Sequence, residues 1–229
     1  MQLTNPAIRI RTSQVEPLGN TLARCFYDDP GVTYILPDPH VRRLVLPWFF
    51  TSVAIRTSRL CGEIYTTANV DGGALWLRPG VESTIGQAAM SERLSMPFRL
   101  DRLSITRWIS VNRYLEAARR DLADKSHWQL VALATERSKN GVSSRGLLVA
   151  PVLAAADWNL QPCYVATFNQ LELPFYEECG FRIAGAGKIP NSGPSFWALI
   201  RTPNRHFPMR AVPNRALAPQ PVQWAKIVL

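Results

Sequence analysis

The hydrophobic pattern of the first thirty residues predicts a strand followed by a helix. Residues 7–12 alternate apolar and polar side chains, which is typical of a strand with one buried face. Ser13, with Glu16 three positions later, is the expected N-cap of the helix. The helix should end at the turn formed by residues 28–31, where proline and glycine interrupt the pattern. Its apolar face consists of Leu18, Leu22, Cys25 and Phe26.

The middle of the chain predicts two helices and a hairpin. Residues 41–57 form a helix with a kink at Pro47. Residues 63–67 and 74–77 form two antiparallel strands, joined by a turn at residues 71–73. Further along, apolar residues at spacings of three and four predict an amphipathic helix, and they are Ile105, Trp108, Val111, Leu115, Ala118 and Leu122.

The last part of the pattern predicts alternating strands and helices. Residues 130–134 are a continuous apolar run too short for a helix, which is typical of a central strand buried on both faces. The elements expected after it are a helix at 147–156, a strand at 163–167, a short helix at 174–178, and strands at 181–184 and 195–201. This alternation predicts mixed α/β layers.

Length and composition divide the chain into two parts. A chain of 229 residues that is 47% hydrophobic fits a single α/β core, so residues 1–201 are predicted to form one domain. Residues 202–229 contain five prolines among basic residues, which predicts an extended arm or a disordered tail. An arm that packs on its own domain or on a neighbour is favoured, because it would cover Phe207, Met209, Val222 and Trp224.

The net charge of +9 comes mostly from arginines that are scattered along the chain. Neither a basic stripe with interleaved aromatic residues nor a known reader motif is present, so no nucleic-acid partner is expected. The same charge suits attraction to anionic small molecules, including a polyphosphate cofactor.

The four cysteines and three histidines predict neither disulfides nor a metal site. Cys25, Cys61, Cys163 and Cys179 have no C-x-x-C spacing and no metal-ligand spacing to histidine, so buried free thiols are expected. The N-terminus has no signal pattern, and no apolar run approaches the roughly 18 residues needed to span a membrane. We therefore expect a cytoplasmic protein with no membrane partner.

Motifs in both halves of the chain resemble the GNAT superfamily of acyl-CoA-dependent acyltransferases, especially its small-molecule N-acetyltransferases. The N-terminal motifs are residues 22–30 (LARCFYDDP), 36–39 (LPDP), 62–67 (GEIYTT) and 74–80 (ALWLRPG). The C-terminal motifs are residues 127–133 (HWQLVAL), 151–154 (PVLA) and 174–181 (PFYEECGF). The resemblance implies a mixed, mostly antiparallel, twisted sheet of six or seven strands that is flanked by helices and splayed between its fourth and fifth strands.

The resemblance also implies acetyl-CoA as the cofactor. In the family, the pantetheine arm pairs with backbone groups in the splayed gap, and the matching backbone here is that of Leu133, Ala134 and Thr135. Asn169 matches a residue that contacts the pantetheine, although a polar residue after a strand also suits a turn. The pyrophosphate lies at the start of the next helix. The matching residues are Asn140, Gly141, Ser143, Ser144, Arg145 and Gly146.

Two residues of this loop depart from the glycines of the family. Ser143 and Arg145 stand where glycine lets the backbone approach the phosphate oxygens. The hydroxyl of Ser143 can itself donate to a phosphate. Arg145 either blocks the loop, pairs with a phosphate through its planar guanidinium, or is a solvated residue in a loop that no longer binds anything. The sequence therefore leaves the use of CoA open.

Tyr176 matches the tyrosine that protonates the departing thiolate in the family. A phenol with a pKa of about 10 can protonate a thiolate with a pKa of about 8.5 only when the two groups are about 3 Å apart. Alternatively, Tyr176 and Phe175 form an aromatic pair that anchors a short helix. Ala166 stands where many relatives have a glutamate, so a general base must come from elsewhere, and the candidates are Glu63, His127 and Asp29.

His127 and Asp29 also have structural interpretations. A lone histidine at the start of a buried strand is often a hydrogen-bonded structural residue, and an aspartate before Pro-Gly suits a turn. In the family, the acceptor side of the cleft is built from the first two helices and the segment after Trp76. Phe26, Asp29 and Trp76 are the expected substrate-binding residues. An apolar wall that contains the tryptophan suits a hydrophobic or aromatic acceptor.

Three functions follow from these features. The first is transfer of an acetyl group from acetyl-CoA to an amine or hydroxyl of a small molecule, by direct attack in a ternary complex. The protein would act as a monomer or a homodimer. The second is a CoA-independent rearrangement, cyclisation or elimination in the same cleft, because the loop glycines and the strand-five glutamate are changed. The third is a binding module without catalysis, with residues 202–229 as its contact surface.

Overall fold

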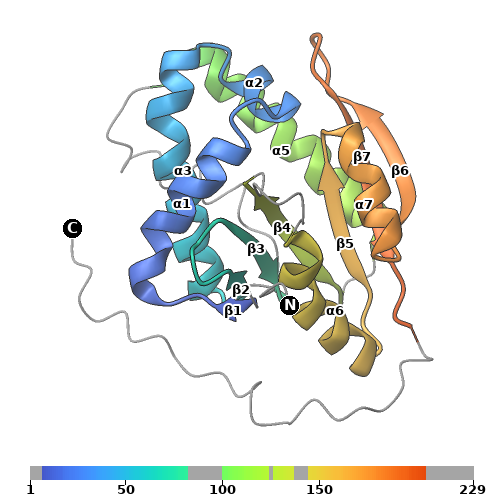
Figure 1. Ribbon diagram of the computed structural model, residues 1–229. Helices are drawn as coiled ribbons and strands as arrows, with labels where there is room; N and C mark the ends of the chain where they lie inside the picture. Colours follow the sequence, from blue (N-terminus) through green and yellow to red (C-terminus); the bar gives the residue numbers. More distant parts are fainter. Residues whose placement is uncertain (1–6, 82–99, 124–125, 137–143, 205–229) are drawn as a thin grey trace.

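The computed structural model describes residues 7–81, 100–123, 126–136 and 144–204, and these form a seven-stranded sheet with helices on both faces (Figure 1). The strands are β1 (Ile8–Arg9), β2 (Glu63–Thr66), β3 (Gly72–Leu77), β4 (Trp128–Thr135), β5 (Cys163–Thr167), β6 (Arg182–Lys188) and β7 (Ser195–Arg201). They lie in the order β1-β2-β3-β4-β5-β7-β6, and every neighbouring pair except β4–β5 is antiparallel. The predicted mixed, mostly antiparallel sheet is confirmed.

The helices cover the two faces of the sheet with two separate hydrophobic clusters. The helices are α1 (Val15–Cys25), α2 (Pro30–Ile35), α3 (Pro39–Arg59), α5 (Arg102–Leu122), α6 (Arg145–Trp158) and α7 (Leu173–Glu178). Ile64, Leu75 and Ala132 pack with α1 and α3 on one face, where Leu18 and Leu22 are fully buried. The opposite face packs against α6 and α7, and its strand residues include Tyr65, Trp76, Leu130 and Val165.

The N-terminal region differs from the sequence prediction in two places. Ser13 lies in a short 3-10 helix (Thr12–Gln14) and is not the cap of α1; instead, the Gln14 side chain accepts a hydrogen bond of 3.0 Å from the backbone N–H of Arg11. Pro30 starts α2, which the sequence pattern did not reveal, because its fixed φ suits the first helical position. The predicted turn at residues 28–31 is therefore the cap of a helix.

The sheet opens between β4 and β5, as the resemblance implied. These two strands pair only where Trp128–Leu130 face Cys163–Val165. Beyond that point β4 pairs with β3 alone, and Thr135 lies opposite Gly72. A Cβ at Gly72 would lie only 2.8 Å from the Ala134 carbonyl oxygen, so glycine permits this close approach. The far edge of β4 is left with no strand partner among the described residues.

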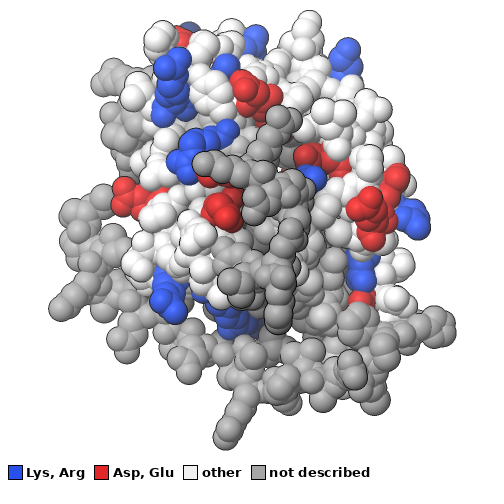
Figure 2. All heavy atoms as spheres, viewed as in Figure 1, with Lys and Arg blue, Asp and Glu red and all other residues white. Residues whose placement is uncertain are grey.

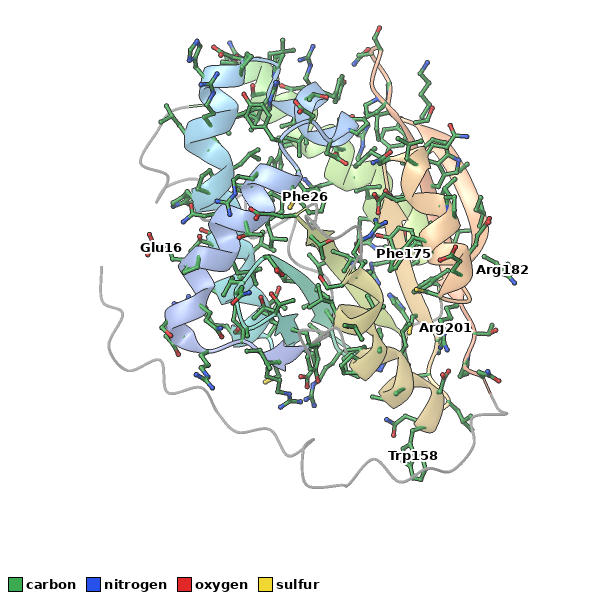
Figure 3. The ribbon with its side chains drawn as sticks, viewed as in Figure 1. Glu16, Phe26, Trp158, Phe175, Arg182 and Arg201 are labelled. Atoms are coloured by element: carbon green, nitrogen blue, oxygen red, sulfur yellow. The ribbon has the colours of Figure 1, made fainter. Side chains whose placement is uncertain are left out.

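A buried ion pair joins the ends of α6, α7 and β7. The Arg201 guanidinium donates two hydrogen bonds of 2.7 Å to the Asp157 carboxylate, and the backbone N–H of Asn204 donates a third, also of 2.7 Å. The Nε of Arg201 donates to the carbonyl oxygen of Cys179 at the end of α7, at 2.9 Å. Figure 3 places Arg201 beside the lower half of α6. The pair therefore holds α7 against the sheet.

The predicted C-terminal arm lies outside the described residues, because nearly all of it falls in 205–229. The arm and the domain division at residue 201 remain predictions. Across the described residues, no helix combines the length and apolarity required to span a membrane.

Candidate functional site

A cavity of about 1110 Å³ occupies the gap where β4 and β5 separate. We call it the central cavity. Its walls are the facing halves of β4 and β5, the segment from the end of α1 into α2, parts of α3 and α5, and the starts of α6 and α7. Figure 3 shows Phe26 and Phe175 on the two sides of this opening, one at the end of α1 and the other on α7. A cavity of this size is large enough to hold a small-molecule ligand.

Tyr176 lies on α7 at the wall of the central cavity, and only 5% of its surface is exposed. Its ring makes edge contacts with Phe175 and Phe181, with centroids 5.5 and 5.8 Å apart. Burial raises the pKa of the Tyr176 phenol, and the charge of Glu172 adds to the increase. The hydroxyl makes no hydrogen bond within the described part of the chain, so it is available to a ligand.

Arg145, the first residue of α6, forms an ion pair with Glu172, which immediately precedes α7. Its guanidinium also lies over the Phe175 ring, 4.5 Å from the centroid. Both charged residues line the central cavity. The pair therefore joins the helix that follows β4 to the helix that follows β5, across the opening between the two strands.

Asp29 lines the central cavity from the start of α2. Its Oδ1 accepts hydrogen bonds from the backbone N–H groups of Gly31 (2.8 Å) and Val32 (3.2 Å), which is the usual N-cap arrangement. Burial raises the pKa of Asp29 above its usual value, the two backbone bonds oppose this, and the charge of Glu172 adds to it. Asp29 is thus a carboxylate with a fixed direction and increased basicity.

Aromatic side chains form part of the wall of the central cavity. Phe26 is stacked on Phe50 with centroids 5.0 Å apart, and Phe49 meets Phe50 edge-on at 5.0 Å. Phe168, at the end of β5, closes the wall next to Gly31, where a Cβ would lie 2.5 Å from the Phe168 ring. The packing leaves an apolar surface within the cavity.

Among the described residues, the lining of the central cavity contains more acidic than basic side chains, although the whole chain is basic. Its described lining residues include Asp28, Asp29, Glu136 and Glu172 but only two basic residues, Arg24 and Arg145. Arg24 is paired with Glu136 at 2.6 Å. On the face drawn in Figure 2, basic and acidic side chains of the described residues are interspersed, without a continuous basic patch. The described part of the lining therefore differs in charge from the chain as a whole.

Several similar solved structures are described as acetyltransferases, whereas no protein-family model matches the sequence. A structure described as histone acetyltransferase HPA2 and related acetyltransferase from Corynebacterium glutamicum is 17% identical, with a TM-score of 0.57 over 87% of this chain and 96% of that one. The polyamine N-acetyltransferase of Drosophila melanogaster is 13% identical, with a TM-score of 0.57 over 86% and 98%. Arylalkylamine N-acetyltransferase 2 of Aedes aegypti is 10% identical, with a TM-score of 0.55 over 86% and 98%.

The chain has the GNAT fold. The parallel β4–β5 pairing, with its separation beyond Leu130 and Val165, is the feature of this fold on which the site is built.

The structure brings together some of the predicted site residues and separates others. Leu133, Ala134, Thr135, Arg145, Asn169, Tyr176, Phe26 and Asp29 all line the central cavity. Ser144 and Gly146 flank Arg145 at the start of α6. Asn140, Gly141 and Ser143 lie outside the described residues. Asn169 also has the turn role considered above, because its Oδ1 accepts a hydrogen bond from the backbone N–H of Leu171 at 3.0 Å.

His127, Trp76 and Glu63 do not line the central cavity in the described structure. His127 is buried at the N-terminal start of β4, where its ring packs edge-on against Tyr164 at 5.8 Å. Trp76 is fully buried in the cluster that packs against α6. Glu63 is buried in ion pairs with Arg9, at 2.7 Å, and with Arg78. Asp29 is thus the one of the three proposed bases that reaches the cavity.

The start of α6 and the edge of β4 fit an elongated ligand with an anionic end. Ser144, the N-cap of α6, makes no side-chain capping bond, and the first turn contains Arg145 but no acidic residue. A Cβ at Gly146 would meet no atom within 4 Å, so the backbone there can be approached closely. The β4 edge at Ala134 offers backbone groups with no strand partner among the described residues.

Sequence reasoning missed Glu172 and the aromatic residues Phe50 and Phe168. Glu172 is three positions before Phe175, but nothing in the local pattern indicates that its partner is Arg145, 27 positions earlier. Phe50 lies in a long helix whose apolar residues surround much of its circumference, so periodicity does not single out the cavity side.

Proposed function

We propose that this protein transfers an acetyl group from acetyl-CoA to the amine of a small hydrophobic or aromatic molecule. The observation that carries this proposal is that Tyr176 and Asp29 line the same cavity in the gap between β4 and β5. Two structures of similar fold are named as N-acetyltransferases of polyamines and arylalkylamines, which supports an amine acceptor.

The donor side of the cavity lies along β4, β5 and the start of α6. Acetyl-CoA supplies an activated acetyl thioester when it is bound. The backbone of Leu133–Thr135 and the side chain of Asn169 hold the amide-rich arm, and Arg145 with the N–H groups of the first turn of α6 holds the phosphates. A position fixed in this way aligns the thioester carbonyl with the acceptor and removes much of the entropic barrier.

The acceptor side lies against the aromatic wall. Phe26, Phe50 and Phe168 give the apolar part of the acceptor a surface to pack on. The acidic lining attracts the ammonium form in which most amines exist at neutral pH. This combination favours a molecule with one amine and an apolar or aromatic body.

Asp29 acts as the base and Tyr176 as the acid in the proton transfers. Asp29 takes a proton from the ammonium, the amine nitrogen then bonds to the thioester carbon, and the carbon–sulfur bond breaks. Tyr176 gives its proton to the sulfur and is restored by the second proton that leaves the nitrogen, while Asp29 releases its proton to water. The raised pKa of Asp29 makes it a stronger base than an ordinary carboxylate. This suits Asp29 to the role, because a carboxylate with an ordinary pKa takes a proton from an ammonium poorly.

The thiol of Cys25 gives no support to an acyl-enzyme route. Cys25 lines the central cavity, and burial together with the charge of Glu136 raises its pKa to about 11. At neutral pH it is therefore a protonated, weakly nucleophilic thiol. This supports direct attack of the amine on the bound thioester.

The first experiment is a calorimetric titration of the full chain with acetyl-CoA, followed by mass spectrometry of reactions with arylalkylamines and polyamines. We expect micromolar binding and a product 42 Da heavier than the amine, which is the mass of an added acetyl group less one hydrogen. A CoA-independent reaction in the same cavity is the second candidate, because Glu172 already balances the charge of Arg145. No detectable binding of acetyl-CoA would favour that candidate.

Asp29→Asn is expected to lower kcat/KM about 100-fold at pH 7.5, because asparagine keeps the N-cap but cannot accept the proton. The acid limb of the pH profile should also disappear. In the wild type this limb should lie above the usual carboxylate range, since the pKa of Asp29 is raised. Initial rates between pH 5 and 9 would measure both effects.

Asp38→Asn is the matched control. Asp38 is also an N-cap before a proline, and its side chain accepts from the backbone N–H of His40 at 2.7 Å, but it does not line the central cavity. It should leave both the rate and the pH profile unchanged. Equal activity of Asp29→Asn and Asp38→Asn would exclude Asp29 as the base.

A further inference from the structure

The start of α6 carries a charge of the wrong sign for a helix N-terminus. The dipole of a helix favours anions at this end, yet the first residue of α6 is Arg145 and its first turn has no acidic residue. The missing anion comes from a different element, because Glu172 pairs with Arg145. The carboxylate of Glu172 therefore provides the negative charge that the helix end and the guanidinium both favour.

Glu172 lies next to one cationic group and near two other acidic groups of the central cavity. The negative charge of Glu172 raises the pKa of Asp29 and of Tyr176, so it lies close enough to interact with both groups. Among the described residues its ion-pair partner is Arg145. Glu172 therefore has an attractive partner in Arg145 and a repulsive neighbour in Asp29, and an anion that binds Arg145 would compete with it directly.

The pair is accessible enough to exchange partners. The exposed fractions of the two side chains are 25% for Arg145 and 27% for Glu172, and both residues line the central cavity. The guanidinium is held separately by stacking on Phe175, so it can keep its place when the carboxylate leaves. An anion that enters the cavity along α6 would meet an oriented guanidinium and the backbone N–H groups of the first turn, which have no carbonyl partner within the helix.

We propose that Glu172 occupies the place of the donor's pyrophosphate in the free protein, so that donor binding exchanges one anionic partner of Arg145 for another. This inference rests on the proposed function for the identity of the donor. Arg145, which stands at a glycine position of the family's loop, then recognises phosphate. Glu172 neutralises Arg145 when no phosphate is bound. A donor without an anionic end would have to leave the pair intact.

The test is a calorimetric comparison of two probes, inorganic pyrophosphate and acetyl-CoA, on matched variants of the full chain. Glu172→Gln removes the competing charge and should tighten the Kd for both probes about fivefold, the scale of a partly exposed ion pair. Arg145→Gln should weaken both about tenfold, since a phosphate loses a charge-assisted hydrogen bond. In the Arg145→Gln background, Glu172→Gln should change neither Kd by more than about twofold, because the competition requires the arginine.

Glu116→Gln is the control for net charge. Glu116 is paired with Arg119 and Arg120 on α5 and does not itself line the central cavity, and its substitution changes the charge by the same amount. It should leave both Kd values unchanged. Circular dichroism melts of all variants would confirm that each is folded.

The outcomes separate this inference from the proposed function. An unchanged or weaker Kd for pyrophosphate in Glu172→Gln, or the same tightening without Arg145, would overturn the exchange. Tighter pyrophosphate binding by Glu172→Gln, in a protein that binds no acetyl-CoA, would support the exchange and reject the proposed acetyl transfer. If Glu172→Gln transferred acetyl groups but bound acetyl-CoA with the wild-type Kd, the proposed function would stand and the exchange would be overturned.

Discussion

Tyr176→Phe is expected to lower kcat about 1000-fold while the Kd for acetyl-CoA changes by less than about twofold, because the phenol acts on the leaving sulfur and not in donor binding. The ring and its contacts with Phe175 and Phe181 are kept, so the fold is not disturbed. The raised pKa of Tyr176 keeps the phenol protonated throughout the neutral range. Single-turnover rates and calorimetry, on the same preparations, measure the two quantities separately.

Tyr164→Phe is the matched control. Tyr164 is also a buried tyrosine whose pKa is raised, to about 12, by burial, but it lies on β5 and does not line the central cavity. Its hydroxyl is buried without a hydrogen-bond partner among the described residues, so its removal should leave activity unchanged and stability equal or higher. If Tyr176→Phe and Tyr164→Phe retain the same kcat, Tyr176 is not the acid.

Asp157→Asn is expected to destabilise the protein by about 3 kcal/mol, because it leaves the buried guanidinium of Arg201 without its carboxylate. Burial alone would raise the pKa of Asp157, but hydrogen bonds from Arg201 and Asn204 outweigh it and lower the pKa. The stability from this pair is therefore present above the usual aspartate pKa and is lost as the pH falls through the lowered value. Urea unfolding at several pH values would measure the loss.

Two further measurements test whether the loss of stability comes from the Asp157–Arg201 pair. The variant should lack the part of the acid-dependent loss of stability that Asp157 causes in the wild type. Glu116→Gln, in which the lost ion pair is more exposed, should cost only about 0.5 kcal/mol. A loss below about 1 kcal/mol in Asp157→Asn would mean that the pair does not hold α7 in place.

Local hydrophobic patterns predicted much of the sheet. The strands at residues 163–167 and 195–201 have the predicted boundaries, because apolar runs bounded by turn residues define them without reference to the rest of the chain. The failures occurred where two local signals compete. Ser13 offers a capping side chain, but the chain forms a 3-10 turn there, and Pro30 can end one helix or begin another.

The site was less predictable because it depends on strand faces and long-range pairs. All six residues of β3 are buried, so no polar alternation shows which face each side chain takes, and Trp76 faces α6 rather than the acceptor side. His127 lies at the beginning of β4, whereas the cavity forms where the strand ends. Glu172 and Arg145 meet only after two strands and two helices have packed.

The short contact between β4 and β5 has a consequence for ligand-dependent stability. Three residue pairs connect the half of the sheet formed by β1–β4 to the half formed by β5–β7. A ligand whose amides bond to the unpaired edge of β4 would act as an extra strand between the halves, and its binding would oppose unfolding by mass action. Without its donor, the protein therefore has a sheet that is interrupted between β4 and β5. The bound donor would supply the missing hydrogen bonds along β4 as well as the reacting group.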